Sequence, residues 1–170
     1  MKKIFLFIIY TFFIILISFK VYSSDSKSNN DHSEANEHLG REGPPPAGPY
    51  RLGFKELQRA IKADNKGKLK KAKIKYEKAL EYLLEANAEY PADSDILNYL
   101  GFTNAKLGFK ENAEIYYRLG LELNSEHNIT KLNLGTFYYN QNRINHAKEV
   151  LNSLKDCDCE EYNKLKMIIK

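Results

Sequence analysis

Two stretches of the chain repeat each other at a spacing of 34 residues. Residues 94–120 match residues 128–154, so that Leu100-Gly101 aligns with Leu134-Gly135. Apolar residues in both stretches recur every three or four positions, which predicts helices, and no long alternation typical of strands occurs. A fixed period of this length is typical of a helix–turn–helix repeat, in which each unit buries its apolar face against the next. We therefore expect an all-α fold.

A third unit precedes these two and is longer than either. Its second half aligns at the same spacing of 34, which places Ala79 opposite Ala113. Its first half aligns only at a spacing of 41, with Gly67 opposite Gly108. The difference of seven residues is close to two helical turns. We therefore expect the second helix of this unit, over residues 68–89, to be longer than its counterparts while it keeps the same buried face.

Small and apolar residues recur at fixed places in the three units. They are Leu100-Gly101, Gly108, Ala113 and Tyr117, then Leu134-Gly135, Tyr138 and Ala147, and in the first unit Ala79, Ala86 and Pro91. In this pattern residues 54–155 resemble the tetratricopeptide repeat (TPR) family, although Leu97 and Lys131 stand where that family has its usual Trp. The resemblance implies a TPR-type α-solenoid of about three helix–turn–helix repeats. Residues 156–170 are expected to form a Cys-containing capping helix.

Two glycines of the pattern are expected inside helices. There each of Gly101 and Gly135 costs about 1 kcal/mol relative to Ala. A helix tolerates this cost where a neighbouring helix has to approach closely. The expected close neighbours are Ala113 and Ala147.

Residues 1–23 have the pattern of a secretory signal peptide. A positively charged start, Met1-Lys2-Lys3, precedes an uncharged run from Ile4 to Ile17, and Ser23 is a suitable residue before a cleavage site. This run is shorter than the roughly 20 residues that a membrane-spanning helix needs. We expect cleavage and a periplasmic or secreted protein. The alternative is an uncleaved segment that anchors the protein in the inner membrane, facing the periplasm, and only then is the membrane a partner.

The residues after the signal peptide have a polar, turn-forming composition. Residues 24–53 are rich in Ser, Asn, Glu, Gly and Pro, which predicts a disordered linker. Acidic and histidine residues between 31 and 38 would hold a metal only on a fixed framework, which such a linker does not provide. Loss of Lys2, Lys3 and Lys20 with the leader would lower the formal net charge from +4 to +1, so nucleic-acid binding is not indicated.

The TPR resemblance also implies which residues face a ligand, because the first helix of each repeat lines a concave groove. These residues are Phe54, Leu57, Ile61, Asn98, Phe102, Leu132, Thr136 and Tyr139. Most are apolar or aromatic, and only Asn98 is of the type that grips a terminal carboxylate, so the expected ligand is an apolar peptide or a helix of another protein. A second interpretation is that they simply pack against neighbouring repeats, and that Tyr50 and Leu52 fold back over the first three.

No enzyme motif is found in the chain. His127 and His146 lack a Ser, Cys or Asp partner at a telling spacing, and no glycine-rich phosphate loop occurs. We expect no catalytic residue, no metal and no cofactor. The predicted function is that of an exported protein-interaction module that acts as an adaptor or assembly factor.

Cys157 and Cys159 are the two cysteines of the chain. In an exported compartment a disulfide between them is expected. Their spacing makes the loop very tight, so the bond would be strained and more easily reduced. Free or partner-linked thiols, or a redox or metal role, are the alternatives. A second functional hypothesis is therefore a thiol-active protein that exchanges disulfides with a client.

Overall fold

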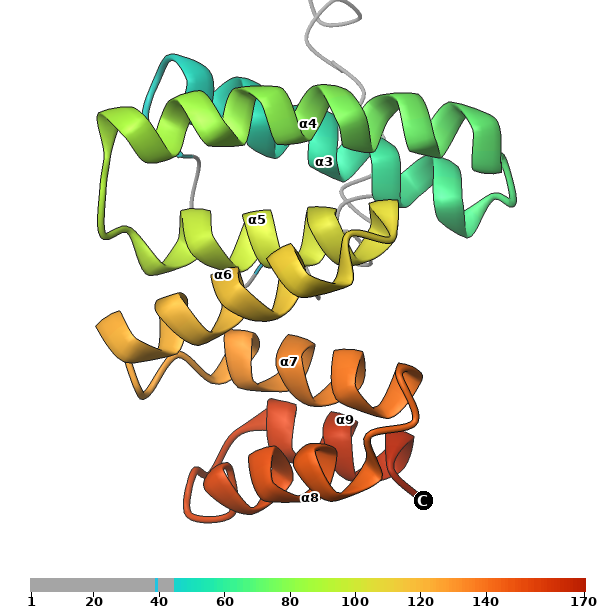
Figure 1. Ribbon diagram of the computed structural model, residues 1–170, viewed down its shortest axis with the longest axis vertical. Helices are drawn as coiled ribbons and strands as arrows, with labels where there is room; N and C mark the ends of the chain where they lie inside the picture. Colours follow the sequence, from blue (N-terminus) through green and yellow to red (C-terminus); the bar gives the residue numbers. More distant parts are fainter. Residues whose placement is uncertain (1–38, 40–44) are drawn as a thin grey trace, which may run out of the picture. The chain divides into compact units, whose positions relative to one another are not determined.

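A computed structural model describes residue 39 and residues 45–170. The expected signal peptide, most of the expected linker and its cluster of acidic and histidine residues lie outside this part. The described helices all belong to one unit, residues 32–170. They are α3 (Pro49–Asn65), α4 (Leu69–Glu89), α5 (Ser94–Leu107), α6 (Lys110–Leu123), α7 (Asn128–Asn140), α8 (Ile144–Ser153) and α9 (Glu160–Ile168) (Figure 1). The described residues contain no strand, so the all-α prediction is confirmed.

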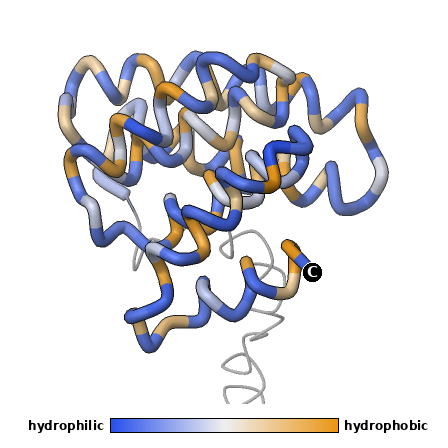
Figure 2. The backbone as a smooth tube through the Cα atoms, turned by 60° about the horizontal axis from the view of Figure 1, so that its bottom comes forward, coloured by the Kyte–Doolittle hydropathy of each residue, from blue (hydrophilic) through white to orange (hydrophobic). Residues whose placement is uncertain are grey.

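Successive helices form antiparallel pairs. Helix α3 pairs with α4, α5 with α6 and α7 with α8, and each pair packs on the next through α4–α5 and α6–α7 contacts (Figure 1). The first helices of the pairs also touch, α3 with α5 and α5 with α7. Hydrophobic and hydrophilic positions alternate along each helix at short intervals, as expected for helices that bury one face (Figure 2). The result is a helical repeat-like arrangement that follows the 34-residue period.

The helix boundaries follow from local chemistry. Asp93 lies directly before α5, and its carboxylate accepts a hydrogen bond of 3.0 Å from the backbone N–H of Ile96, which caps the helix. Helix α5 ends at Gly108, whose φ of 85° lies in the left-handed region that a glycine adopts without strain. Asn142 has the same role after α7, with a φ of 59°.

Helix α4 is the longest of the described helices. It spans 21 residues, against 14 in α6 and 10 in α8. Its bounds agree with the range of 68–89 expected from the seven-residue difference in spacing. The prediction of an extended second helix in the first unit is therefore confirmed.

The start of α3 corrects the predicted linker. This helix begins at Pro49, so residues 49–53 are helical and do not belong to a disordered segment. Proline suits the first position of a helix because it has no N–H to leave unsatisfied there. Tyr50 is buried, whereas Leu52 is 46% exposed and does not cover the first unit. Leu39 is also fully buried, in the same core cluster as Tyr50.

The two helical glycines have different close neighbours from those expected. A Cβ atom added at Gly101 would lie 2.6 Å from the ring of Tyr117, and one added at Gly135 would lie 2.5 Å from the side chain of Leu165 in α9. The expected neighbours, Ala113 and Ala147, are therefore not the atoms that require glycine. Helix α9 packs on α7 and makes fewer contacts with α8, so it covers the last pair of helices as a cap.

Candidate functional site

A hollow of about 200 Å³ lies where α5, α6 and α7 meet. Its walls include Phe102, Ala105 and Lys106 from α5 and Asn133, Thr136 and Asn140 from α7. Two of the predicted groove residues, Phe102 and Thr136, are therefore brought together here. The rings of Tyr117 and Phe137 complete the apolar part of the wall, and their centroids lie 6.1 Å apart.

Amide side chains form the polar part of the hollow. The side-chain amide of Asn133 donates a hydrogen bond of 2.9 Å to the carbonyl oxygen of the buried Asn98, which joins α7 to α5. Asn140 is exposed and Gln141 is half-buried at the end of α7, and both line the hollow. A primary amide offers two donors and one acceptor, so it can pair with the backbone of an extended peptide.

The positive charge of Lys106 is balanced within the structure. Its ammonium group donates a hydrogen bond of 2.8 Å to Asp64 and lies 5.5 Å from the ring centroid of Phe102. The hydroxyl of Tyr76 also donates to Asp64, at 3.3 Å. Burial, and then the charge of Asp64, raise the pKa of Tyr76 above its usual range. This side of the hollow is therefore closed by a fixed polar contact between α3, α4 and α5.

Several of the predicted groove residues are buried and present no surface to a ligand. Leu57, Ile61 and Asn98 are almost fully buried, as the second interpretation of the sequence expected. Leu132 is buried in a separate cluster with Leu154 and Leu165, so it packs toward the C-terminal cap. The apolar groove predicted from the TPR positions is therefore not an open surface at these four residues.

Two other predicted groove residues are half-buried and lie outside the hollow. The ring of Phe54 lies 5.5 Å from the ring of Tyr99, which links α3 to α5. Tyr139 packs against the main core cluster. Of the eight predicted residues, Phe102 and Thr136 are thus the two that line the hollow.

The amide residues of the hollow were not predicted from the sequence. Asn133 and Asn140 are seven residues apart, which is close to two helical turns, so they share one face of α7. That spacing was visible in the sequence. It could not show, however, that this face of α7 meets Phe102 of α5.

His127 has the acidic partner that the sequence did not indicate. Its Nε2 atom lies 3.2 Å from the carboxylate of Asp95, and its Nδ1 atom is hydrogen-bonded to the hydroxyl of Thr130. Thr130 is fully buried, so a substrate has no access to this hydroxyl. The three residues join the start of α7 to the start of α5. The ring of His146 instead lies 5.3 Å from that of Tyr138.

A charged contact fixes α6 against the third pair of helices. Arg143 donates hydrogen bonds to both carboxylate oxygens of Glu114, and the hydroxyl of Tyr138 donates another of 2.9 Å. The hydrogen bonds from Arg143 lower the pKa of Glu114, and burial, together with Glu114, raises the pKa of Tyr138 to about 12. The guanidinium also lies 4.4 Å from the ring centroid of Tyr138, a cation–π distance.

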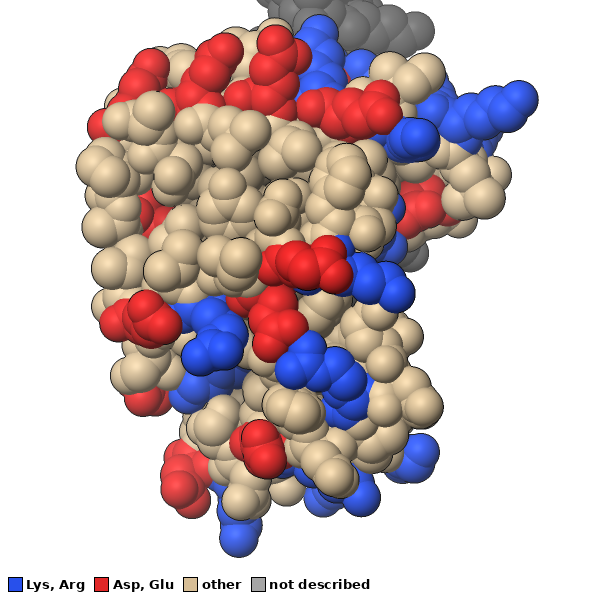
Figure 3. All heavy atoms as spheres, in the orientation of Figure 1, with Lys and Arg blue, Asp and Glu red and all other residues tan. Residues whose placement is uncertain are grey.

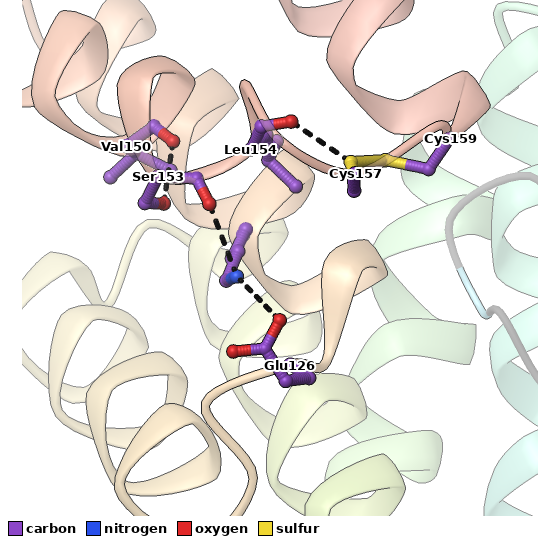
Figure 4. Close-up of a disulfide and its surroundings, with 7 residues drawn as sticks. Glu126, Val150, Ser153, Leu154, Cys157 and Cys159 are labelled. Atoms are coloured by element: carbon purple, nitrogen blue, oxygen red, sulfur yellow. Dashed lines mark hydrogen bonds and ion pairs between the residues drawn. A yellow bond between two sulfur atoms is a disulfide. The ribbon is translucent and has the colours of Figure 1, made fainter.

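The two cysteines form a disulfide in the loop between α8 and α9 (Figure 4). The predicted pairing of Cys157 with Cys159 is confirmed. Both residues are half-buried and pack against the cluster of Leu132, Leu154 and Leu165. The sulfur of Cys157 also lies 2.9 Å from the backbone carbonyl oxygen of Leu154.

Lys131 stands where the TPR family has a large aromatic residue, and its side chain takes a different role. The residue is buried, and its ammonium group donates a hydrogen bond of 3.3 Å to the carbonyl oxygen of Ser153 (Figure 4). It also lies 3.6 Å from the carboxylate of Glu126. Its stem therefore fills apolar space while its charge satisfies the last turn of α8.

Residues 39 and 45–170 contain no group of three or more His, Cys, Asp or Glu side chains that could hold a metal ion. None of the helices in this part of the chain is both long and apolar enough to cross a membrane. The comparisons with known proteins also give no guide: no protein-family model, curated protein or solved structure matches the chain.

Proposed function

We propose that the protein is an exported protein-interaction module of the TPR type, which acts as an adaptor or assembly factor. It binds a peptide or a helical segment of another protein at the hollow between α5 and α7. The observation that carries this proposal is the hollow itself, where Phe102 and Thr136 meet the amides of Asn133 and Asn140. Apolar walls with a few polar groups at the edge are the usual composition of a binding site.

The size of the hollow indicates what enters it. Pockets that hold whole small molecules have volumes of about 300–1,000 Å³, and this hollow of about 200 Å³ is smaller. It suits a single large side chain of a longer ligand. The amides of Asn140 and Gln141 at its edge would then pair with the backbone on either side of that side chain.

The repeat geometry supports the TPR part of the proposal. Gly67, Gly108 and Asn142 all have a positive φ, and each lies in the loop between the two helices of a pair. Gly108 and Asn142 are 34 residues apart, which is the TPR period. Contacts between first helices are also what a solenoid with a concave inner face requires.

Blocking the hollow is the test of the proposed site. The half-buried Thr136, replaced by Arg, would fill the hollow from its edge, whereas Phe102 and Leu132 are too buried for a polar substitution to leave the fold intact. A photo-crosslinking residue placed at Gln141 then reports what binds beside the hollow in intact cells. We expect the crosslinked species to disappear in the Thr136→Arg variant.

The matched control is Asn112→Arg, which adds the same side chain to an exposed position of α6. It should leave the crosslinked species unchanged. Identical crosslinks in both variants would show that the hollow is not the binding site. Export is tested separately by mass spectrometry of the native protein, which should begin at Ser24. An intact Met1 would favour the anchored alternative.

A further inference from the structure

Basic side chains gather at the tip of the hairpin formed by α3 and α4. A hollow of about 400 Å³ at this tip is lined by Arg59, Lys62, Lys66, Lys68, Lys71 and Lys75. Residues 59–75 contain eight Lys or Arg residues and one acidic residue, Asp64. Figure 3 shows lysine and arginine side chains at the right-hand end of this hairpin, beside a row of acidic side chains that follows α4. The charges of the first unit are therefore separated in space.

The basic segment coincides with the insertion that distinguishes the first unit. Eleven residues separate Gly67 from Ala79, whereas four separate the equivalent residues Gly108 and Ala113. The eleven residues, KLKKAKIKYEK, include six lysines. The two extra turns of α4 thus add positive charge, and they are not needed to continue the repeat.

The distribution of charge along α4 opposes the helix dipole. Lysines occupy its N-terminal half and glutamates its C-terminal half, with Lys70, Lys71, Lys73, Lys75 and Lys78 on one side and Glu77, Glu81, Glu85 and Glu89 on the other. The first turn has no acidic residue and the last turn has no basic one. Because the N-terminus of a helix carries partial positive charge, this order lowers the stability of the helix. Local departures from stabilising rules are expected where a surface serves a function.

Several of these lysines have no intramolecular partner. Lys75 pairs with Glu56 at 2.7 Å, and Lys73 lies 3.9 Å from Glu77. Lys66, Lys68, Lys70 and Lys71 are exposed, and no ion pair involves them within the part of the chain that the structure describes. They are therefore available to bind an anion outside the protein.

Two apolar side chains are exposed among these lysines. Leu69 is 67% exposed at the start of α4, and Ile74 is 63% exposed one turn further along. The tip offers no exposed aromatic ring on which a nucleobase could stack, since Tyr76 is buried. Lysines with adjacent apolar side chains are instead the composition that binds the headgroup region of an anionic bilayer. We propose that the α3–α4 tip docks on an anionic phospholipid surface.

The test measures the partition of the full chain between buffer and vesicles. Vesicles of phosphatidylcholine alone are compared with vesicles that contain phosphatidylglycerol, so that any contribution of the N-terminal apolar run is the same in both. We expect a preference for the anionic vesicles that weakens as the salt concentration rises, because salt screens exposed charges. Replacing Lys66, Lys68 and Lys71 with Glu should reduce this preference by at least about tenfold.

This variant is suited to the test because it should not unfold the protein. Glutamate near the start of α4 agrees with the helix dipole, so the melting temperature is expected to stay equal or to rise. A control variant with the same change in net charge replaces the exposed Lys110, Lys148 and Lys155 with Glu. It should retain most of the anionic preference. A second variant, Leu69→Ser with Ile74→Ser, should weaken partitioning several-fold while the salt dependence is retained.

Three results would overturn the proposal. These are no preference for the anionic vesicles, an equal loss in the tip and control variants, and binding to a single-stranded oligonucleotide or to polyglutamate without binding to vesicles. The proposal is independent of the peptide-binding hollow. The tip variant should therefore leave the crosslinks from Gln141 unchanged.

Discussion

Asn142 lies 34 residues after Gly108, and both residues have a left-handed backbone conformation in the loop that joins the two helices of a pair. Their φ angles are 59° and 85°. The loop of the repeat therefore depends on a backbone conformation, and asparagine adopts it more readily than other residues with a side chain.

Replacing Asn142 with Val should destabilise the protein by about 1–2 kcal/mol, because a β-branched residue is strained in the left-handed region. Asn142→Gly should cost little, since glycine adopts this region freely. Urea denaturation followed by circular dichroism measures both effects. Asn112→Val, in the exposed face of α6, is the control, and an equal loss there would contradict the explanation based on φ.

The close contact at Gly101 predicts an opposite effect of alanine at two glycines. Gly101→Ala would place a methyl group 2.6 Å from the ring of Tyr117, which should cost about 1–3 kcal/mol through overpacking. At Gly120 the nearest atom is Leu97 Cβ at 3.4 Å, so a methyl group fits. Gly120→Ala should therefore be neutral or should stabilise the helix by up to about 1 kcal/mol. Thermal unfolding of the two variants distinguishes them, and equal melting temperatures would refute the argument.

The burial of Leu39 predicts that a residue inside a polar segment contributes to stability. Leu39 is fully buried in the main core cluster, so Leu39→Ala should cost about 2–5 kcal/mol through lost burial and the cavity left behind. Leu52→Ala is the control, because Leu52 is 46% exposed and its loss should change stability by less than about 0.5 kcal/mol. Chemical denaturation of the full chain measures the difference. A negligible effect of Leu39→Ala would mean that this residue does not anchor its segment.

The sequence was sufficient to predict the features that depend on local periodicity. The 34-residue spacing indicated the paired helices, and the difference of seven residues indicated the extended α4. The separation of one residue between Cys157 and Cys159 left few alternatives to a disulfide in an oxidising compartment. Each of these predictions depends on residues that are close in sequence or related by a fixed period.

The features that were missed depend on contacts between distant residues. Leu39 is a single leucine in a polar segment, and no pattern shows that it is buried. Asp95 and His127 are 32 residues apart, in different pairs of helices. The hollow exists because α5, α6 and α7 meet at particular angles, and periodicity does not determine those angles.

The disulfide should contribute little to stability. The loop that it closes contains one residue between the cysteines, and the entropy lost by the unfolded chain increases with loop length. Replacing both Cys157 and Cys159 with Ser should therefore lower the free energy of unfolding by about 2 kcal/mol or less. Crosslinking from Gln141 should remain unchanged in this variant. Loss of the crosslinked partner in a folded double variant would instead favour the thiol-active hypothesis.

The contact between Glu114 and Arg143 predicts a stability difference that depends on pH. The pKa of Glu114 is lower in the folded protein than its usual value of 4.5, chiefly because Arg143 donates hydrogen bonds to the ionised form. Folding therefore favours the ionised carboxylate, and the stabilisation is fully present above the unfolded pKa. It is lost as the pH falls through the lowered folded pKa. Glu114→Gln should cost about 1.5–3 kcal/mol at pH 7, and this cost should shrink below pH ~4.5.

The control is Glu122→Gln, eight residues further along α6, where the glutamate is exposed. Urea denaturation at a series of pH values gives the free energy of unfolding for both variants and for the unmodified chain. Tyr138→Phe provides a second test from the other side of the contact. Its pKa is raised to about 12, so the unmodified chain should lose stability between the usual tyrosine pKa of 10 and that value, and Tyr138→Phe should reduce this loss. The same pH dependence in Glu114→Gln and Glu122→Gln would show that the contact does not stabilise the junction between α6 and α7.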